Sequence, residues 1–301
     1  MNGVLPLFKE KNMTSFDCIS QLRKILHTKK IGHTGTLDPN VDGVLPICVG
    51  PATKISELLM QSGKAYRGSI TLGVAYDTED LDGNIIDSKP VDSPFTDQQI
   101  DEALENMVGD IEQIPPMFSA VKINGRKLYE YAREGIEIER PARTIHIDYF
   151  KQTSPSVYDE EQRQQTIYFE VGCSKGTYVR TLAVDFGKSL GLPAVMSSLT
   201  RIKSAGFTID QCVKLSEVAE AMEAGEIDQY LVSLDDSLSQ YPSVDLSDKL
   251  FQLVSNGVFL DIDEVNSSAQ VVKLKYQNQV KALYQFDENK RQYRPYKMFL
   301  N

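Results

Sequence analysis

The 301-residue chain lacks any long apolar run, although 41% of its residues are hydrophobic. A membrane-spanning helix needs about 20 consecutive apolar residues, and no segment approaches that length. The first twelve residues also lack the basic region and apolar stretch of a secretory signal peptide. We therefore expect a cytoplasmic protein with no membrane partner, long enough for one large domain and one small one.

Residues that bind metals or form disulfides are few and scattered. The chain has four cysteines without a Cys-x-x-Cys pair, and its three histidines lie far apart in the sequence. This usage is typical of reduced, packed thiols in a cytosolic protein and provides no pattern of metal ligands. There is no glycine-rich nucleotide-binding motif and no lysine pattern for a covalently held cofactor. We expect neither a metal nor a cofactor.

The chain also lacks the positive excess that is typical of nucleic-acid-binding proteins, because its formal net charge is −10. The negative charge is concentrated in two segments. Residues 76–112 hold twelve acids and one base, residues 207–245 hold nine acids and one base, and residues 171–206 hold five bases and one acid. Because binding requires a basic face rather than a basic total, RNA remains a compatible partner, bound with modest, salt-dependent affinity.

The segment from Lys29 to Ser56 combines four glycines and three prolines with many apolar residues. Glycine and proline exclude a regular helix or a long strand, whereas the apolar residues predict burial. A buried irregular backbone needs specific hydrogen bonds, and such loops are usually functional. Asp38 lies at the centre, where Pro39 disfavours a helical conformation. Asp38 therefore either caps an Asp-Pro turn or presents its carboxylate to a ligand.

This central segment resembles the catalytic motif of the TruB family. It reads Gly-His-Thr-Gly-Thr-Leu-Asp-Pro over 32–39, Gly-Val-Leu-Pro-Ile over 43–47 and Ala-Thr-Lys over 52–54. Members of this family are bacterial tRNA pseudouridine synthases that act on the uridine at position 55 in the TΨC loop. The resemblance implies that Asp38 is the catalytic nucleophile, that His33 stacks in the bound loop, and that Lys54 contacts the substrate.

Two further segments resemble the family. Tyr66, in Lys-Ala-Tyr-Arg at the start of a predicted strand, matches a family tyrosine that lies against the target base, which implies base stacking and a candidate general base. Arg180, in Ser-Lys-Gly-Thr-Tyr-Val-Arg, falls in the first turn of a predicted helix, where the helix dipole disfavours a cation. The family arginine pairs with the catalytic carboxylate, which implies an Arg180–Asp38 ion pair that keeps Asp38 ionised. Tyr178 would lie near the same pocket, and Leu199 matches a leucine that packs on the flipped base.

Three other places bear on the site. The family has Lys-Pro-x-Gly after the first strand, whereas here Lys9 precedes Glu10, and Asn12 replaces the glycine. Asparagine tolerates the left-handed conformation, so we expect the turn to form here as well. On the family resemblance, we keep Lys9 among the candidate substrate-binding residues. The acidic turn at 77–83 lacks calcium-loop spacing and resembles a family segment, which implies that Asp80 organises the site. Four bases lie at the end of the family-like segment 114–122 and after it, and either form a solvated face or contact RNA; they are Lys122, Arg126, Lys127 and Arg133.

Periodic patterns predict an α+β fold. A helix begins at Thr14 or Ser15 with Phe16 on its buried face, and another spans 96–109 after a capping box. Strands over 144–151 and 166–173 flank a polar loop at 154–165, and alternation places Tyr149 with the buried face and Phe150 opposite it. The resemblance implies a pseudouridine-synthase-like catalytic domain over 1–242, with a mainly antiparallel mixed sheet flanked by helices and loops. Short strands then fit a small β-rich PUA-like RNA-binding domain over 243–301.

The function that this resemblance implies is isomerisation of a flipped-out uridine to pseudouridine in the T-arm of tRNA, by a monomer. Asp38 would attack C1′ or C6, or a glycal intermediate would form, and Tyr66 or a water would remove the C5 proton. Two other classes stay open: a tRNA-binding folding chaperone without catalysis, and a nucleoside N-glycoside hydrolase with paired carboxylates. A guide-dependent relative is an alternative within the same class.

Overall fold

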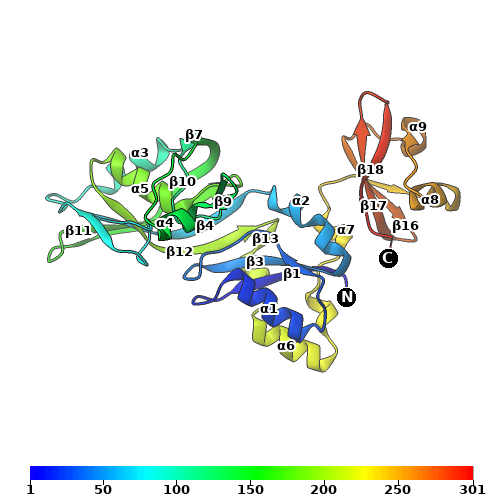
Figure 1. The fold of residues 1–301 in the computed structure, drawn as a ribbon, viewed down its shortest axis with the longest axis horizontal. Coiled ribbons are helices and arrows are strands. Elements are labelled where there is room, and N and C mark those ends of the chain that lie inside the picture. The colour runs from blue at the N-terminus through cyan, green and yellow to red at the C-terminus, as the bar shows by residue number, and fades with distance from the viewer. Residues whose placement is uncertain (301) are drawn as a thin grey trace.

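The computed structural model of the chain describes residues 1–300. The molecule is elongated, with a large curved sheet at one end and a smaller sheet at the other (Figure 1). The large sheet has nine strands in the order β1-β3-β12-β4-β11-β10-β7, with β2 beside β3 and β13 beside β12. Its strands are β1 (Gly3–Lys9), β2 (Ile31–His33), β3 (Asp42–Val49), β4 (Lys64–Leu72), β7 (Gly109–Gln113), β10 (Arg143–Asp159), β11 (Gln164–Cys173), β12 (Ala194–Ser204) and β13 (Phe207–Thr208). All pairs are antiparallel except β3–β12, which confirms the predicted mixed sheet.

Helices cover this sheet in two groups (Figure 1). Helices α3 (Asp97–Glu105) and α5 (Val179–Ser189) pack on β10 and β12, and α1 (Ser15–Ile25) packs against α6 (Leu215–Ala224). One continuous hydrophobic core extends from Leu5 on β1 to Phe186 on α5. The shorter helices of this part are α2 (Ser56–Met60), α4 (Leu128–Arg133) and α7 (Leu234–Ser237), with 3-10 turns η1 (Gly50–Ile55), η2 (Ile209–Gln211) and η3 (Ile227–Tyr230).

The smaller sheet is separate and has its own core. Its five strands run in the order β14-β16-β17-β18-β15. Buried residues such as Leu274 and Tyr284 form a distinct hydrophobic cluster. This arrangement confirms a separate β-rich part at the C-terminal end of the chain. Its elements are β14 (Ser243–Asp245), α8 (Asp248–Ser255), β15 (Leu260–Asp261), α9 (Ile262–Val265), β16 (Val271–Tyr276), β17 (Gln279–Asp287) and β18 (Gln292–Met298).

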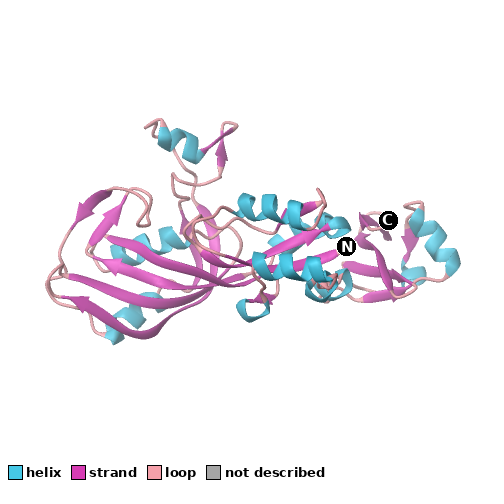
Figure 2. Ribbon diagram, turned by 90° about the horizontal axis from the view of Figure 1, so that it is seen from below, coloured by secondary structure: helices cyan, strands magenta, loops and turns pink. Residues whose placement is uncertain are grey.

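Two small hairpins complete the fold. Strands β5 (Val74–Tyr76) and β6 (Ile85–Ser88) enclose the acidic turn. Strands β8 (Lys122–Ile123) and β9 (Arg126–Lys127) lead into α4 and form a segment that stands away from the large sheet (Figure 2). We call residues 122–135, which comprise β8, β9, α4 and the turn that follows, the projecting segment.

The predicted helix starts are confirmed, but parts of the predicted packing are wrong. Thr14 and Thr96 cap α1 and α3 with complete capping boxes. Phe16, however, is 64% exposed, because the buried face of α1 runs through Ser15, Cys18, Ile19 and Leu22. Helix α3 ends at Glu105, four residues before the predicted end.

The predicted strand over 144–151 is present, but its predicted end and part of its packing are wrong. Strand β10 continues to Asp159, through the first half of the predicted loop at 154–165, and pairs with β11. A register shift between Ile147 and Tyr149 reverses the alternation of side chains, so Phe150 is buried and Tyr149 is half-buried. A β-bulge has this effect because an extra residue changes which face the following side chains occupy.

Candidate active site

The central loop, residues 34–41 between β2 and β3, has no regular secondary structure. Specific hydrogen bonds hold its backbone, as a buried irregular backbone requires. The Leu37 amide donates to Ser15 Oγ at 2.9 Å, and the Thr34 amide donates to the Pro46 carbonyl at 3.1 Å. Gly35 has a φ of 140°, a region that favours glycine. Leu37 and Val41 are buried on either side of Asp38. The loop is therefore anchored close to Asp38, whose own side chain is 46% exposed.

Arg180 joins this loop to α5. Its Nε lies 3.2 Å from Asp38 Oδ2, and its Nη1 lies 3.6 Å from Asp80 Oδ2. The guanidinium also donates to the carbonyl oxygens of Thr78 and Phe118, at 2.8 and 2.9 Å. The Arg180 side chain is only 7% exposed. Two carboxylates and two carbonyls thus compensate a cation that is buried and placed at a helix N-terminus.

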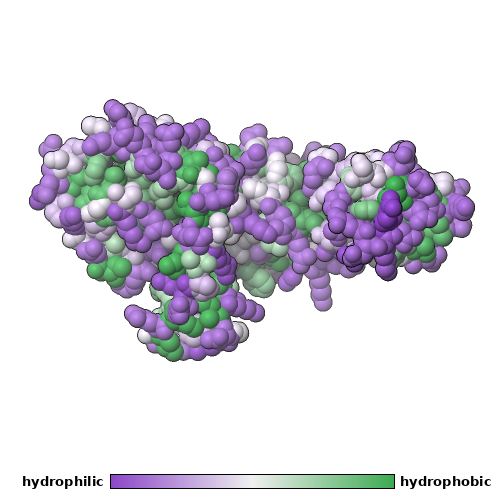
Figure 3. Space-filling view, turned by 90° about the horizontal axis from the view of Figure 1, so that it is seen from above, coloured by the Kyte–Doolittle hydropathy of each residue, from purple (hydrophilic) through white to green (hydrophobic). Residues whose placement is uncertain are grey.

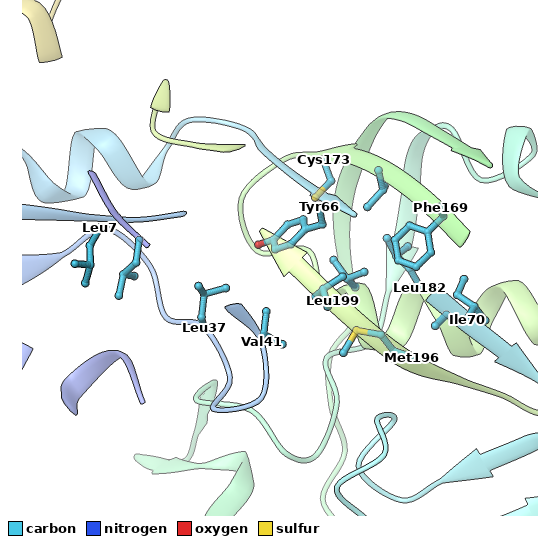
Figure 4. Close-up of a cluster of buried hydrophobic side chains, with 14 of the residues drawn as sticks. Leu7, Leu37, Val41, Tyr66, Ile70, Phe169, Cys173, Leu182, Met196 and Leu199 are labelled. Atoms are coloured by element: carbon cyan, nitrogen blue, oxygen red, sulfur yellow. The ribbon is translucent and has the colours of Figure 1, made fainter. Parts of the chain in front are cut away.

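Tyr66 and Leu199 come from neighbouring strands and lie beside Leu37 and Val41 of the central loop (Figure 4). Tyr66 is 8% exposed and Leu199 is 7% exposed. Burial raises the pKa of the Tyr66 phenol, and the Arg201 charge across the strand pair opposes that rise. The two side chains provide apolar surfaces on which a base can stack.

A cavity of about 820 Å³ brings these groups together. Five of the eight predicted site residues line it: Asp38, Tyr66, Tyr178, Arg180 and Leu199. The projecting segment contributes Tyr129 to the same cavity, and the loop before it contributes Phe118. The cavity therefore combines a carboxylate, a paired arginine and an apolar slot, which suits a planar base attached to a sugar.

The structure does not bring the other three predicted residues into this cavity. Lys9 is fully buried and donates to the Pro39 carbonyl at 3.1 Å, so it lies beneath the loop. Lys54 donates to the Met298 carbonyl at 2.8 Å, at the contact with the smaller sheet. His33 is half-buried, and its Nδ1 accepts a hydrogen bond from the Gly35 amide, while burial lowers the pKa of its imidazole. Asn12 adopts the left-handed φ of 64°, as predicted for the turn after Lys9.

Arg201 is a site residue that the sequence analysis missed. Its guanidinium is 1% exposed and donates to the carbonyl oxygens of Gly35, Thr36 and Val44. Alternation on a strand places it on the same face as Leu199, two residues earlier. This alternation is the signal in the sequence that could have identified Arg201 as a site residue. Its hydrogen-bond partners are backbone carbonyls, which no residue type identifies.

The four predicted bases of the projecting segment are largely engaged within it. Arg126 pairs with Glu134 and lies over the Tyr131 ring, and Arg133 lies over the Tyr129 ring. Figure 3 shows this segment as a lobe set apart from the body, with hydrophobic surface among polar side chains. Both earlier interpretations, a solvated face and a contact with RNA, are compatible with this placement.

Within residues 1–300, no group of three or more His, Cys, Asp or Glu side chains is arranged to hold a metal ion. None of the helices in that range is both long and apolar enough to cross a membrane. The side chains that line the cavity offer a carboxylate for nucleophilic attack and a phenol for proton transfer.

Comparisons with known proteins identify the family of the chain. A family model described as the TruB family pseudouridylate synthase N-terminal domain matches residues 23–179, and one described as the tRNA pseudouridylate synthase B C-terminal domain matches 180–239. The tRNA pseudouridine synthase B of Levilactobacillus brevis is 55% identical over 300 residues, which cover 99% of both chains. That of Pediococcus pentosaceus is 52% identical over 300 residues, covering 100% of this chain and 99% of the relative.

A solved structure supports the same assignment. The crystal structure of a Cbf5-Nop10-Gar1 complex contains a chain with 25% identity and a TM-score of 0.70, covering 94% of this chain and 78% of that chain. A second structure, of an H/ACA RNP bound to a substrate RNA, shares the fold at 22% identity, with a TM-score of 0.72 over 99% of this chain and 85% of that chain. The chain therefore belongs to the TruB family of pseudouridylate synthases, which are isomerases.

Proposed function

We propose that the protein isomerises the uridine at position 55 in the T-arm of tRNA to pseudouridine, acting as a cytoplasmic monomer without metal or cofactor. The observation that carries the proposal is the contact between Arg180 and Asp38 at the mouth of an apolar slot. The names of these relatives supply the substrate class, tRNA. The T-arm and the position within it come from the resemblance of residues 32–54 to the family motif.

In the proposed reaction, the target base leaves its stack and enters between Tyr66 and Leu199. Asp38 attacks C1′ or C6 of the nucleotide, or promotes loss of a proton towards a glycal. The N1–C1′ bond breaks, the base turns, and a C5–C1′ bond forms. The bond from Asp38 to C1′ or C6 breaks, or the proton lost towards the glycal returns, which restores the free carboxylate. Tyr66 or a water then removes the proton from C5, and N1 gains a proton. No electrons are exchanged with another molecule, so no redox partner is needed.

Four further assignments belong to this proposal. Arg180 keeps Asp38 in place and ionised, and Tyr178, two residues before Arg180 in the chain, lines the same cavity. His33, beside the loop, stacks within the bound RNA. Residues 243–301 form a small PUA-like domain that contacts the tRNA away from the reacting base, beyond a catalytic domain over 1–242. Lys54 lies where these two parts meet, and Lys9 supports the loop from below.

The test is to map pseudouridine in an unmodified tRNA transcript after incubation with the protein and EDTA, by chemical labelling and primer extension. We expect one new pseudouridine, at position 55, and none in a matched transcript that has cytidine there. An isolated T-arm hairpin should serve as a substrate. Three results would contradict the proposal. Binding of the tRNA without modification would favour a folding chaperone. A requirement for a guide RNA would favour a guide-dependent enzyme, and release of free uracil would favour a hydrolase.

A further inference from the structure

Lys64 is a cation of the catalytic cavity without a carboxylate partner among residues 1–300. Its Nζ lies 3.5 Å from the carbonyl oxygens of Met60 and Ser62, at the limit of a hydrogen bond. Arg180 and Arg201, by contrast, are held by carboxylates or by three carbonyls at shorter distances. Of these three cations, Lys64 has the longest hydrogen bonds, and its ammonium group is therefore available to a ligand.

Lys64 also lies in the right place to meet the reacting nucleotide. It begins β4, and Tyr66 follows two residues later on the same face, at about 7 Å along the strand. A β-carbon on Gly35 would lie 3.6 Å from Lys64 Cε, so the end of this side chain rests against the loop that carries Asp38. The Lys64 side chain thus lies on the strand that carries Tyr66 and against the loop that carries the nucleophile.

A second cavity, of about 510 Å³, begins on the other side of Lys64. Its lining includes Ser62, Lys203 and Gln240, and Lys64 lines both cavities. Lys203 lies on β12 opposite Ala65, the residue after Lys64. An RNA strand that leaves the catalytic cavity in this direction would pass one lysine and then another.

The surroundings of Lys64 make an anion favourable there. Burial and the nearby charges of Arg201 and Lys175 lower the pKa of its ammonium group. A cation that is partly desolvated and close to other cations gains much from a full negative charge. A phosphodiester is such a charge, and lysine binds phosphate as a compact cation with several donors.

We propose that Lys64 binds one of the two phosphodiester groups that flank the ribose of the target uridine. This inference rests on the proposed function. When the base lies between Tyr66 and Leu199 and Asp38 reaches the ribose, the phosphates attached to that ribose enter the cavity with it. The contact would select a nucleotide within a strand over a free nucleoside, which carries no phosphate.

The first test compares tRNA affinity of Lys64→Gln, Lys64→Arg and the wild type across a series of salt concentrations. Lys188→Gln is the matched control, because it removes the same charge from an exposed position on α5. We expect Lys64→Gln to bind roughly tenfold more weakly, as for loss of a charged hydrogen bond. The slope of log K against log salt should fall by about 0.7–0.9, the value of one phosphate contact. Lys64→Arg should retain the slope, and the control should match the wild type.

The second test uses tRNA in which a single neutral methylphosphonate replaces the phosphate on the 5′ or the 3′ side of the target uridine. The wild type should lose affinity for one of the two, and Lys64→Gln should lose nothing further with that substrate. Equal additional losses in both proteins, or no loss by the wild type with either linkage, would overturn the contact. Pseudouridine formation by the wild type in unmodified tRNA is scored separately, so that failure of the reaction itself is distinguished from failure of this inference.

Discussion

Two buried arginines fix the position of the catalytic loop at the scale of single residues. Arg180 contacts the Asp38 carboxylate, whereas Arg201 donates to backbone carbonyls, at Gly35, Thr36 and Val44. Burying a guanidinium is costly unless its donors are satisfied. The three carbonyls offset that cost for Arg201 and tie the loop to β12, the strand that also presents Leu199.

Arg201→Gln should lower both stability and catalysis. The shorter, neutral side chain leaves carbonyl oxygens of the loop without donors, at about 1–3 kcal/mol for each unsatisfied group. We expect kcat to fall at least tenfold, about 1.4 kcal/mol of activation free energy, while KM changes less, because the loop no longer holds Asp38 in place. Single-turnover rates measured at a temperature where circular dichroism shows the variant to be folded would check this. Arg201→Lys, which keeps one donor group, should be intermediate; an unchanged kcat in Arg201→Gln would contradict the positioning role.

The sequence allowed some of these residues to be predicted and hid others. The helix dipole indicated that Arg180 needs compensation, and the family resemblance implied Asp38 as its partner; the ion pair is present, together with Asp80. The partners that tie Arg201 and Lys9 to the central loop are backbone carbonyls far away in the chain, and no residue type marks them. Burial of Lys9 therefore became visible only in the fold.

At the scale of elements, the start of α1 serves as the anchor of the central loop. Ser15, its first residue, is 1% exposed, accepts a hydrogen bond from the Leu37 amide and donates to the Leu37 carbonyl. The capping box of Thr14 and Asp17 fixes this end of the helix. The residue before Asp38 is thus held by a helix terminus rather than by a strand ladder.

Ser15→Ala should lower the free energy of unfolding by about 1–3 kcal/mol, because the buried Leu37 amide and carbonyl lose their partner. The same change should reduce kcat, since the segment next to Asp38 becomes mobile. Urea denaturation and steady-state kinetics measure the two effects. Ser20→Ala, the same substitution further along α1, is the control. Equal stability of the two variants would contradict the anchoring contact.

Periodicity predicted where elements begin better than how long they continue. Capping residues are local, so the starts of α1 and α3 follow from a few neighbouring residues. The length of β10 depends on its pairing with β11, and the bulge after Ile147 depends on that pairing too. Neither is encoded in the alternation of a single strand. Phe16 shows the same limit, because an apolar residue at a helix start can lie outside the packed face.

At the scale of the whole molecule, a hydrophobic cluster that includes Val280, Leu283 and Phe299 and a group of charges attach the smaller sheet to the rest. Asp235 of α7 pairs with Lys273 and Lys275 of β16, and Lys273 is 4% exposed. Lys54 donates to the Met298 carbonyl at the end of β18, and Glu57 pairs with Lys297 on the same strand. These contacts join residues widely separated in sequence, so the sequence predicted the second sheet but not its attachment.

Asp235→Asn should loosen this attachment. We expect roughly a fivefold rise in the Kd for tRNA with little change in kcat, because the two surfaces that we propose to bind one RNA would lose their fixed orientation. Asp236→Asn is the control on the same helix. Small-angle scattering should show a broader distribution of distances for Asp235→Asn alone. Unchanged scattering and affinity would contradict the role of this contact.

The contact between Asp235 and its two lysines also predicts that the stability of the folded protein decreases at acidic pH. Hydrogen bonds from Lys273 and Lys275 lower the pKa of Asp235 below its ordinary value of 3.8. When folding lowers the pKa of a carboxyl, that carboxyl stabilises the folded state. The stabilisation is complete at a pH above the ordinary pKa of the group and is lost as the pH falls through the pKa of the folded state. The difference in stability between the wild type and Asp235→Asn should therefore shrink below pH 3.8, which denaturant titrations over that range would measure.

The central claim, that Asp38 is the nucleophile of a cofactor-free isomerase, is tested most directly by tritium release from tRNA labelled at uridine C5. The wild type, with EDTA present, should release one tritium per tRNA, because the C5 proton must leave when C5 bonds to C1′. Asp38→Asn, which preserves size and removes the charge, should bind tRNA and release none. Equal release by the two proteins would contradict the account, and so would tRNA binding by the wild type without any release.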